Sequence, residues 1–412
     1  MALVAIFLLL LLVVVIGHRR KKRNSGLLTN WPVAGMMPEL LENITRIHDF
    51  ATDVLKNSGG TFEFKGPWFA NHHFLVTNDP INVHHILNAS FANYPKGPDF
   101  KKIFEPFGDG IINSESDLWK NQRRMYQTLI GQSKYEPFIE KTILGKVVDG
   151  LIPVLDHVSK SSIQVDLQDV FQRLTLDNIC LLVLGFNPHC LSVEFPKVEC
   201  KKAFDDVEEI IFHRHFKPQS WWRLQRWLQI GREKKLTRSL KVFDDFIYKC
   251  IASKRHELSK FEITDESNFD MLTTYMKKQE EKQEQVDCIS NSDKFLRDTA
   301  FNLMVAGGDT ISAGLTWVKE TWGEDCLEFK PERWISCDGK EIVNVPAYKF
   351  TAYNAGPQSC LGKGMSFIVM KMVAATMLWN YRVEVAEGYP ISPSLSIVLY
   401  MKHGLKVSIS HR

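Results

Sequence analysis

The sequence has no pair of cysteines separated by two residues, although it holds eight cysteines among its 412 residues. Structural zinc sites usually take their cysteines from such close pairs, and disulfide frameworks are typical of short secreted chains. The scattered spacing therefore argues against zinc and favours reduced thiols in a protein that faces the cytosol. The cysteines are Cys180, Cys190, Cys200, Cys250, Cys288, Cys326, Cys337 and Cys360.

An excess of charge of one sign is also missing. The chain has 51 Lys and Arg against 48 Asp and Glu, a formal net charge of +3. Nucleic-acid-binding domains usually carry a clear basic excess, so no nucleic acid partner is expected. The 44% of hydrophobic residues is enough for a large core, and the length allows two or three domains.

The longest apolar run lies at the start, over residues 2–16, and a basic run follows it at residues 18–23. A cleavable signal peptide carries its positive charge before the apolar run and ends in small residues, and neither holds here. We therefore predict an uncleaved transmembrane anchor over 1–17, with the basic side and the bulk of the chain in the cytosol. A helix of this length spans about 25 Å, which suits the thin endoplasmic reticulum bilayer. A buried core helix is the alternative, which the adjoining basic run disfavours.

Residues 18–44 form a basic and proline-rich hinge, in which Pro32, Gly35 and Pro38 predict a stiff elbow. The rest, 45–412, is predicted as one globular domain. Alternating apolar residues at 62–64 and 74–77 predict a hairpin. Apolar periodicity predicts mostly helix over 135–184 and a further helix over 203–212.

Three further stretches have a distinct composition. Residues 107–112 combine two glycines with apolar side chains and predict a flexible loop. Residues 213–228 interleave three tryptophans with basic residues, which suits either a membrane interface or ordinary core packing. Residues 264–293 are rich in charge and predict a surface linker.

A long buried helix is predicted over 293–317, where apolar residues recur every three to four positions. Gly307 and Gly308 stand in its middle, where each costs roughly 1 kcal/mol relative to alanine. Asp309 and Thr310 then place an acid and an alcohol in an apolar helix. Either these residues serve chemistry, or they mark a kink that packing tolerates.

Cys360 lies on a loop between Gly356 and Gly362, just before an apolar run that predicts a helix. Unpaired amides at a helix start stabilise an anion, so the thiolate form is favoured there. A rigidly held thiolate is a suitable axial ligand for haem iron. The alternative is a small buried hydrophobe, the usual role of a lone cysteine. Upstream, Trp119 and Arg123 are four residues apart and share a helix face.

The stretch from Tyr353 through Gly356 and Cys360 to Gly362 resembles the haem-binding signature of the cytochrome P450 family. Two positions depart from the family pattern: Tyr353 replaces a phenylalanine, and Gln358 replaces a basic residue that pairs with a haem propionate. The segment 306–310 resembles the family's oxygen-activation motif, with Ile311 where a second alcohol is usual.

The resemblance implies a mainly α fold with a minor β-sheet and haem b as cofactor. Cys360 would ligate the iron, Tyr353 would shield its sulfur, and Gly356 and Gly362 would shape the loop. Trp119 and Arg123 would hold a haem propionate, with Gln358 able to give it only a hydrogen bond. Gly307 and Gly308 would open a groove for dioxygen, to which Asp309 and Thr310 would deliver protons.

The chain is most similar to the plant fatty-acid and alkane hydroxylase clan of that family. This implies hydroxylation of an apolar long-chain substrate, with electrons from an NADPH-dependent flavoprotein reductase. It also implies residence in the endoplasmic reticulum membrane, with the catalytic domain on the cytosolic side. The loop at 107–112 would cover the substrate pocket.

One block of the family pattern is missing. Residues 329–334 resemble the family's Phe-x-Pro-Glu-Arg-Trp element, yet they follow the long helix almost directly. The sequence contains no Glu-x-x-Arg, the pair that locks onto the arginine matching Arg333 in the family. We therefore predict an internal deletion near 317–322, with part of the core missing. A buried charge left unpaired costs several kcal/mol.

Three other functions stay open. The first is a truncated protein that binds little haem and is catalytically inactive, which the deletion favours. A haem-thiolate isomerase or dehydratase is a second possibility, and the presence of Asp309 and Thr310 argues against it. An unrelated membrane-anchored scaffold is the third, which the two matched motifs disfavour.

Overall fold

The computed structural model describes residues 28–69, 72–260, 270–281, 293–316, 332, 335–336, 341–343 and 345–412. The chain divides into two compact units, one of residues 1–94, 218–221 and 345–359, the other of 95–217, 222–344 and 360–412. The predicted anchor, the junction at 317–322 and Arg333 lie outside the described residues. In the described part of the chain, no helix is both long and apolar enough to cross a membrane.

The smaller unit contains a two-stranded antiparallel sheet, in which Thr61 lies opposite Thr77. This confirms the predicted hairpin. The predicted elbow ends earlier than residue 38, because a helix already begins at Met37 and takes Pro38 into its first turn, where the missing N–H costs nothing. The elements are α2 (Met37–Glu42), α3 (Ile47–Asn57), β1 (Thr61–Lys65), β2 (His73–Thr77) and α4 (Pro80–His84).

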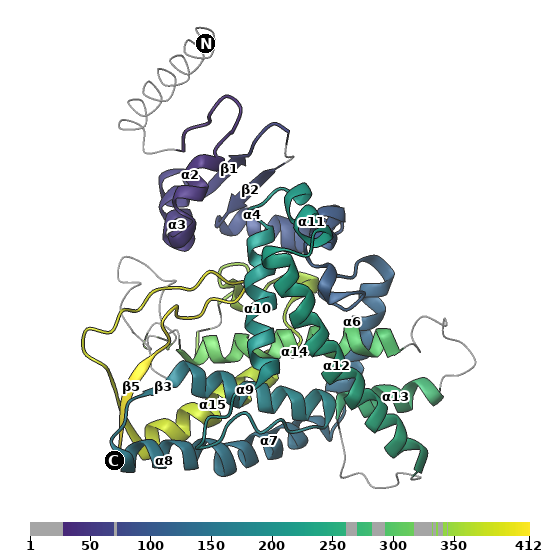
Figure 1. Cartoon of the computed structure of the whole chain (residues 1–412), viewed down its shortest axis with the longest axis vertical. Coiled ribbons are helices and arrows are strands. Elements are labelled where there is room, and N and C mark those ends of the chain that lie inside the picture. The colour runs from purple at the N-terminus through teal and green to yellow at the C-terminus, as the bar shows by residue number, and fades with distance from the viewer. Residues whose placement is uncertain are drawn as a thin grey trace. The chain divides into compact units, whose positions relative to one another are not determined.

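The larger unit is mainly helical, as predicted (Figure 1). Its sheet is small and antiparallel, with β5 (Lys406–His411) between β3 (Val165–Asp166) and β4 (Tyr381–Val385). The helices are α5 (Gly97–Ile103), α6 (Ser116–Ile130), α7 (Tyr135–Lys146), α8 (Ile152–Ser161), α9 (Leu167–Leu184), α10 (Glu199–Arg214), most of α11 (Gln219–Trp227), α12 (Gly231–Lys260), α13 (Met271–Glu281), α14 (Asp293–Thr316) and α15 (Lys363–Asn380).

Two buried apolar clusters form the core of this unit, and both α9 and α14 contribute to each. Ile179 of α9 and Phe301 of α14 belong to the first cluster, with residues of α10, α12 and α13. Leu174 of α9 and Ile311 of α14 belong to the second, with residues of α7, α8 and α15. The two helices therefore hold the unit together, which explains why most residues of α14 are buried.

The predicted surface linker over 264–293 is wrong where the structure describes it. Residues 271–281 form α13, whose side chains at Met271, Leu272, Tyr275 and Met276 are buried. These positions follow the i, i+1, i+4, i+5 spacing of a helix face that packs against α9. This short apolar pattern was missed in the sequence because many charged residues surround it.

The tryptophans at 221–227 divide between the two predicted roles. Trp222 is only 4% exposed, and the guanidinium groups of Arg214 and Arg226 lie 4.5 and 5.6 Å from the centre of its ring. Trp221 and Trp227 are 51% and 78% exposed. One tryptophan is therefore a core residue, and the other two are exposed.

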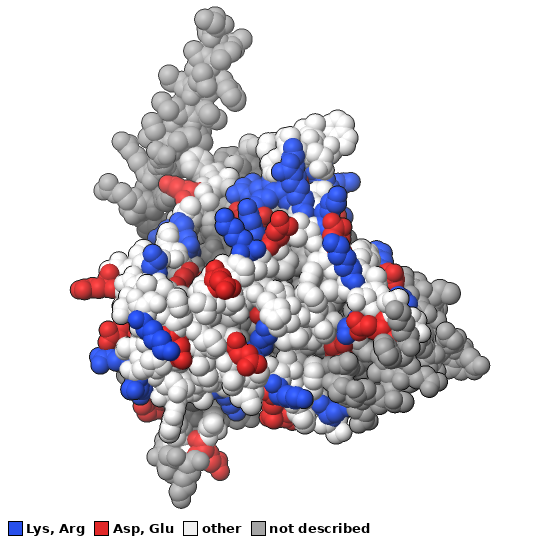
Figure 2. Space-filling view, turned by 60° about the horizontal axis from the view of Figure 1, so that its bottom comes forward, with Lys and Arg blue, Asp and Glu red and all other residues white. Residues whose placement is uncertain are grey.

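Figure 2 shows one face of the molecule, on which basic and acidic side chains are interspersed over a largely uncharged surface. This distribution follows from the near balance of the two signs in the sequence. A face of this kind has no long-range field of one sign to attract an oppositely charged polymer.

Candidate active site

The middle of α14 carries an open row of small side chains. Ala306, Thr310 and Gly314 are exposed, although most other residues of this helix are buried. They follow one another at intervals of four residues, so each lies one turn beyond the last along the same row. The row gives a flat ligand access to the backbone of a buried helix.

The adjacent glycines lie on the packed side of the same helix. A Cβ at Gly307 would lie 2.5 Å from Cδ1 of Ile179, and a Cβ at Gly308 would lie 3.1 Å from the Phe204 ring. Their lack of side chains therefore allows α9 and α10 to approach α14 closely. This accounts for two costly glycines in mid-helix, while the dioxygen groove stays a prediction.

Asp309 and Thr310 point to different surroundings. The Thr310 hydroxyl is exposed and donates to the carbonyl oxygen of Ala306 at 2.6 Å. Asp309 is 5% exposed, and burial raises the pKa of its carboxyl to about 7. The negative charge of Asp205 adds to this rise, whereas Lys201 and a hydrogen bond from Gln172 oppose it. The acid is therefore poised to hold or release a proton near neutral pH.

A second buried acid, Glu208 of α10, was not predicted from the sequence. Its Oε2 accepts a hydrogen bond from Ser396 Oγ at 3.3 Å, while its Oε1 and the Oδ2 of Asp309 have no hydrogen-bond partner among the described residues. Burial, followed by the charges of Asp309 and Asp205, raises the pKa of Glu208 well above its usual range. These acids therefore form a buried cluster in which the protonated forms are favoured.

Cys360 is exposed and free, three residues before α15 begins at Lys363. The predicted helix after this cysteine is confirmed. A Cβ at Gly362 would have only one neighbour within 4 Å, the Cys360 sulfur at 3.8 Å. The space beside the thiol is therefore open on the side of Gly362.

Trp119 and Arg123 lie together on α6, as their spacing predicted. Trp119 is 9% exposed, and the Arg123 guanidinium lies 5.6 Å from its ring. Burial lowers the pKa of Arg123, and the nearby Cys360 partly opposes that change. The structure thus brings Arg123 and Cys360 within electrostatic reach of each other.

Tyr353, Gly356 and Gln358 belong to the smaller unit, where two short 3₁₀ turns hold them. Gly356 has a φ of +66°, and a Cβ there would collide with the carbonyl oxygen of Leu87. This confirms that the turn requires glycine. Tyr353 and Gln358 are half-buried. Their arrangement around a cofactor stays a prediction.

The residues of the larger unit fit the expected haem. Cys360 offers an accessible soft donor, Arg123 offers a cation near it, and the row at Ala306 and Thr310 offers small side chains. A haem needs a thiolate to bind its iron and a cation to neutralise its propionate. Cys360 and Arg123 are side chains of these two kinds. Among the described residues, no cluster of three or more His, Cys, Asp or Glu could hold a metal ion by itself.

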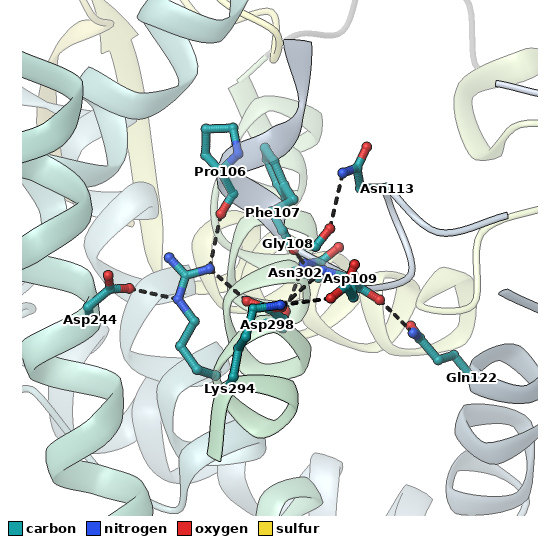
Figure 3. A network of polar contacts seen from close by, with 11 residues as sticks. Pro106, Phe107, Gly108, Asp109, Asn113, Gln122, Asp244, Lys294, Asp298 and Asn302 are labelled. Carbon is teal, nitrogen blue, oxygen red and sulfur yellow. Dashed lines mark hydrogen bonds and ion pairs between the residues drawn. The ribbon is translucent and has the colours of Figure 1, made fainter. Parts of the chain in front are cut away.

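The loop at 107–112 is not the flexible segment that its glycines predicted. Side chains of α14 hydrogen-bond to its backbone at several points (Figure 3). The partners lie about 190 residues away in the sequence, so no local pattern could have predicted them.

Comparison with known proteins gives one consistent result. The family model of cytochrome P450 matches residues 26–318 and 319–408. Alkane hydroxylase MAH1 of Arabidopsis thaliana is 36% identical, and the alignment covers 94% of each chain. Cytochrome P450 86B1 of the same plant is 33% identical over 93% of this chain and 85% of its own length. Noroxomaritidine synthase of Narcissus aff. pseudonarcissus MK-2014 is 32% identical over 93% and 91%.

The form of these matches bears on the predicted deletion. The two matched segments of the family model meet between Val318 and Lys319. The alignment with the alkane hydroxylase runs over 468 positions, which exceeds the 412 residues of this chain. The relative therefore has residues at positions where this chain has none.

Proposed function

This chain belongs to the cytochrome P450 family of monooxygenases, and we propose that it hydroxylates long-chain alkanes or fatty acids with dioxygen and electrons from an NADPH-dependent flavoprotein reductase. The observation that carries the proposal is the exposed Cys360 thiol within electrostatic reach of Arg123. The likeness to an alkane hydroxylase along nearly the whole chain supports the substrate class.

Haem, when bound, supplies the activated oxygen that is inserted into a C–H bond. The chain's own residues would hold it. Cys360 would provide a thiolate ligand to the iron, and Arg123, kept in place against Trp119, would neutralise a propionate. Gly362 leaves the space beside the sulfur open. The role of Tyr353 and Gln358 in this site is part of the proposal.

Proton supply would rest on the buried acids. The pKa of Asp309 is about 7, and burial raises the pKa of Glu208 well above its usual range. We call the exposed residues Ala306, Thr310 and Gly314 of α14 the open row. Of these three residues, Thr310 is the one with a hydroxyl. Rotation of this hydroxyl away from the Ala306 carbonyl would let it donate to a ligand on the open row.

Contact with a membrane fits the surface around α11. Trp227, Leu228 and Ile230 are 78%, 47% and 50% exposed, and basic residues adjoin them. Such a surface suits the interface of an anionic bilayer. Together with the predicted anchor over 1–17, it supports placement on the cytosolic side of the endoplasmic reticulum membrane, from which an apolar substrate would enter.

A second candidate function is that of a haem-poor, inactive member of the family. The break of the family match between Val318 and Lys319 favours it, as does the absence of any Glu-x-x-Arg in the sequence. Arg333 would then lack the partners that such a pair provides in the family.

Coexpression of the full chain with a plant reductase tests both candidates. Haem content, the carbon monoxide difference spectrum and oxygenated products of palmitic acid and of a long-chain alkane would be measured. A thiolate-type spectrum with NADPH-dependent hydroxylated product supports the monooxygenase. Normal folding with little haem and no product supports the inactive member and rejects the proposed activity.

A further inference from the structure

A small cavity lies in the interior of the larger unit, between four helices. Its volume is about 10 Å³, and a single water molecule needs roughly 10–15 Å³. Residues of α6, α9, α13 and α14 line the cavity, and most of them are apolar. Three lining side chains carry a hydroxyl: Tyr126 of α6, Tyr275 of α13 and Thr299 of α14.

Two of these hydroxyls are buried without a hydrogen bond. Tyr126 is 1% exposed and Thr299 is 4% exposed, and neither hydroxyl has a hydrogen-bond partner among the described residues. Burial raises the pKa of Tyr126, and the nearby Thr299 partly opposes that rise. The two side chains therefore lie close to each other at the edge of the cavity. A hydroxyl that stays unpaired in apolar surroundings lowers the stability of the fold.

Side chains of the same kinds are paired elsewhere in this unit. Thr310 of α14 donates its hydroxyl to the carbonyl oxygen of Ala306, one turn back in the same helix, at 2.6 Å. Thr299 forms no such bond to its own helix. Tyr381 is 2% exposed, and its hydroxyl donates to Asp156 Oδ1 at 2.5 Å. Tyr126 and Thr299 therefore stand out among the buried hydroxyls, and both of them border the cavity.

We propose that Tyr126 and Thr299 bind one buried water molecule, which joins α6 to α14. Water suits the site because it donates two hydrogen bonds and accepts two, so it pairs with either hydroxyl whether that group donates or accepts. An ion needs charged partners, and the described residues that line the cavity carry no charge. A larger ligand exceeds the volume.

The bridge holds the helix that also carries Arg123. Tyr126 follows Arg123 by three residues, or about one turn of α6. A water bound to both hydroxyls therefore fixes this end of α6 to the long helix in the core of the unit. The chain forms the cavity by itself, so the bridge does not depend on haem.

The test is a double-mutant cycle with Tyr126→Phe and Thr299→Val, which remove the hydroxyls and nearly keep the shapes of the side chains. Urea unfolding of the full chain gives the equilibrium constant of unfolding for each variant. Crystal structures of the original chain and of the double variant show whether a water is bound in the cavity.

Thr316→Val is the matched control. It removes a buried threonine hydroxyl from the same helix, but this hydroxyl donates to the Ser312 carbonyl at 3.0 Å. It also lies about 25 Å along the helix axis from Thr299. Its effect should therefore add to that of Tyr126→Phe.

Each single variant should raise the unfolding constant roughly fivefold, because it breaks the bridge that the water forms. The double variant should raise it little further, because the first substitution has already broken the bridge. The original chain should show electron density for one water within hydrogen-bond distance of both hydroxyls, and the double variant should show none.

Three results overturn the bridge. Single variants that are as stable as the original chain, or more stable, mean that both hydroxyls are buried unpaired. Additive effects of the two substitutions mean that nothing joins the two residues. Coupled effects without electron density for a water mean that the two hydroxyls bond directly to each other. If one variant does not fold, the other variant and the density in the original chain still decide.

Discussion

Arg214 and Glu233 form two parallel hydrogen bonds in the protein interior. Arg214 Nε donates to Glu233 Oε1 at 2.9 Å, and Nη2 donates to Oε2 at 2.7 Å, with both side chains about 1% exposed. Arg214 also donates to the Ile103 carbonyl at 3.0 Å and stacks on Trp222. The pair therefore joins α10, α12, the end of α5 and, through Trp222, α11.

Replacing Arg214 tests this pair. Arg214→Ala should lower the free energy of unfolding by up to about 3–5 kcal/mol, because the buried Glu233 carboxylate loses its two parallel bonds and keeps only Arg226, at 3.2 and 3.3 Å from its Oε2. Arg214→Lys should not rescue it, since an ammonium cannot form the two parallel bonds or stack on Trp222. Urea unfolding of the full chain is the measurement. Arg226→Ala is the control, with an expected loss of about 1 kcal/mol or less because Arg226 is 36% exposed. A lysine variant as stable as the original chain would contradict the prediction.

Cys360 is predicted to be the iron ligand wherever haem binds. Cys360→Ala should abolish a thiolate-type carbon monoxide difference spectrum, because the described part of the larger unit offers no other thiol at this open surface. The other described cysteines are buried or half-buried, and burial raises the pKa of their thiols. Cys250→Ala is therefore a suitable control. A spectrum that survives Cys360→Ala would reject the assignment.

The buried acid at Asp309 predicts a pH dependence of stability. Its pKa is about 7 in the folded chain against an ordinary 3.8, so between these values the folded state holds a proton that the unfolded state has lost. Stability from this group is therefore complete below pH 3.8 and is lost as the pH rises through about 7. The charged groups facing it are Asp205, Glu208 and Lys201.

Asp309→Asn should remove this loss of stability at high pH, because an amide does not titrate. The difference in unfolding free energy between variant and original chain should grow in favour of the variant from about pH 5 to about pH 8, by on the order of 1–3 kcal/mol. Urea unfolding at the two pH values measures it, and titrating groups that do not interact with Asp309 cancel in the difference. A difference independent of pH would mean that Asp309 is not the titrating group.

Much of the fold could be predicted because its signals are local. The apolar period over 293–317 predicted α14, and the alternation near residues 62 and 75 predicted the hairpin. The pair of Trp119 and Arg123 followed from helical spacing alone. In each case the residues that determine the structure lie within one element.

The parts that could not be predicted depend on distant partners. The loop glycines at Gly108 and Gly110 predicted mobility, whereas Asp298 and Asn302 hold the loop from a helix about 190 residues further along. Glu208 reads as a surface acid of α10, and only packing against α14 places it near Asp309. Local composition carries no information on such pairings.

The predicted anchor over 1–17 has a topological consequence. With the basic run on its C-terminal side, the bulk of the chain should face the cytosol. Protease added to intact microsomes should digest the globular part, and the sequons at Asn43 and Asn88 should carry no glycan. Detergent-treated microsomes provide the control for access. Protection from protease, or a glycan at either asparagine, would reverse the orientation.

The predicted deletion should limit haem binding more than any single residue does. Gln358 removes one cation near a propionate, Arg333 lacks a Glu-x-x-Arg partner, and the family match breaks between Val318 and Lys319. Each could cost a few kcal/mol, and a folded protein usually has only about 5–15 kcal/mol of stability in total.

Inserting the corresponding block of alkane hydroxylase MAH1 after Val318 should therefore raise the haem bound per chain several-fold. Gln358→Arg alone should raise it little, since one exposed or half-buried ion pair contributes about 1 kcal/mol or less. Stoichiometric haem in the unaltered chain would show that the missing block is dispensable.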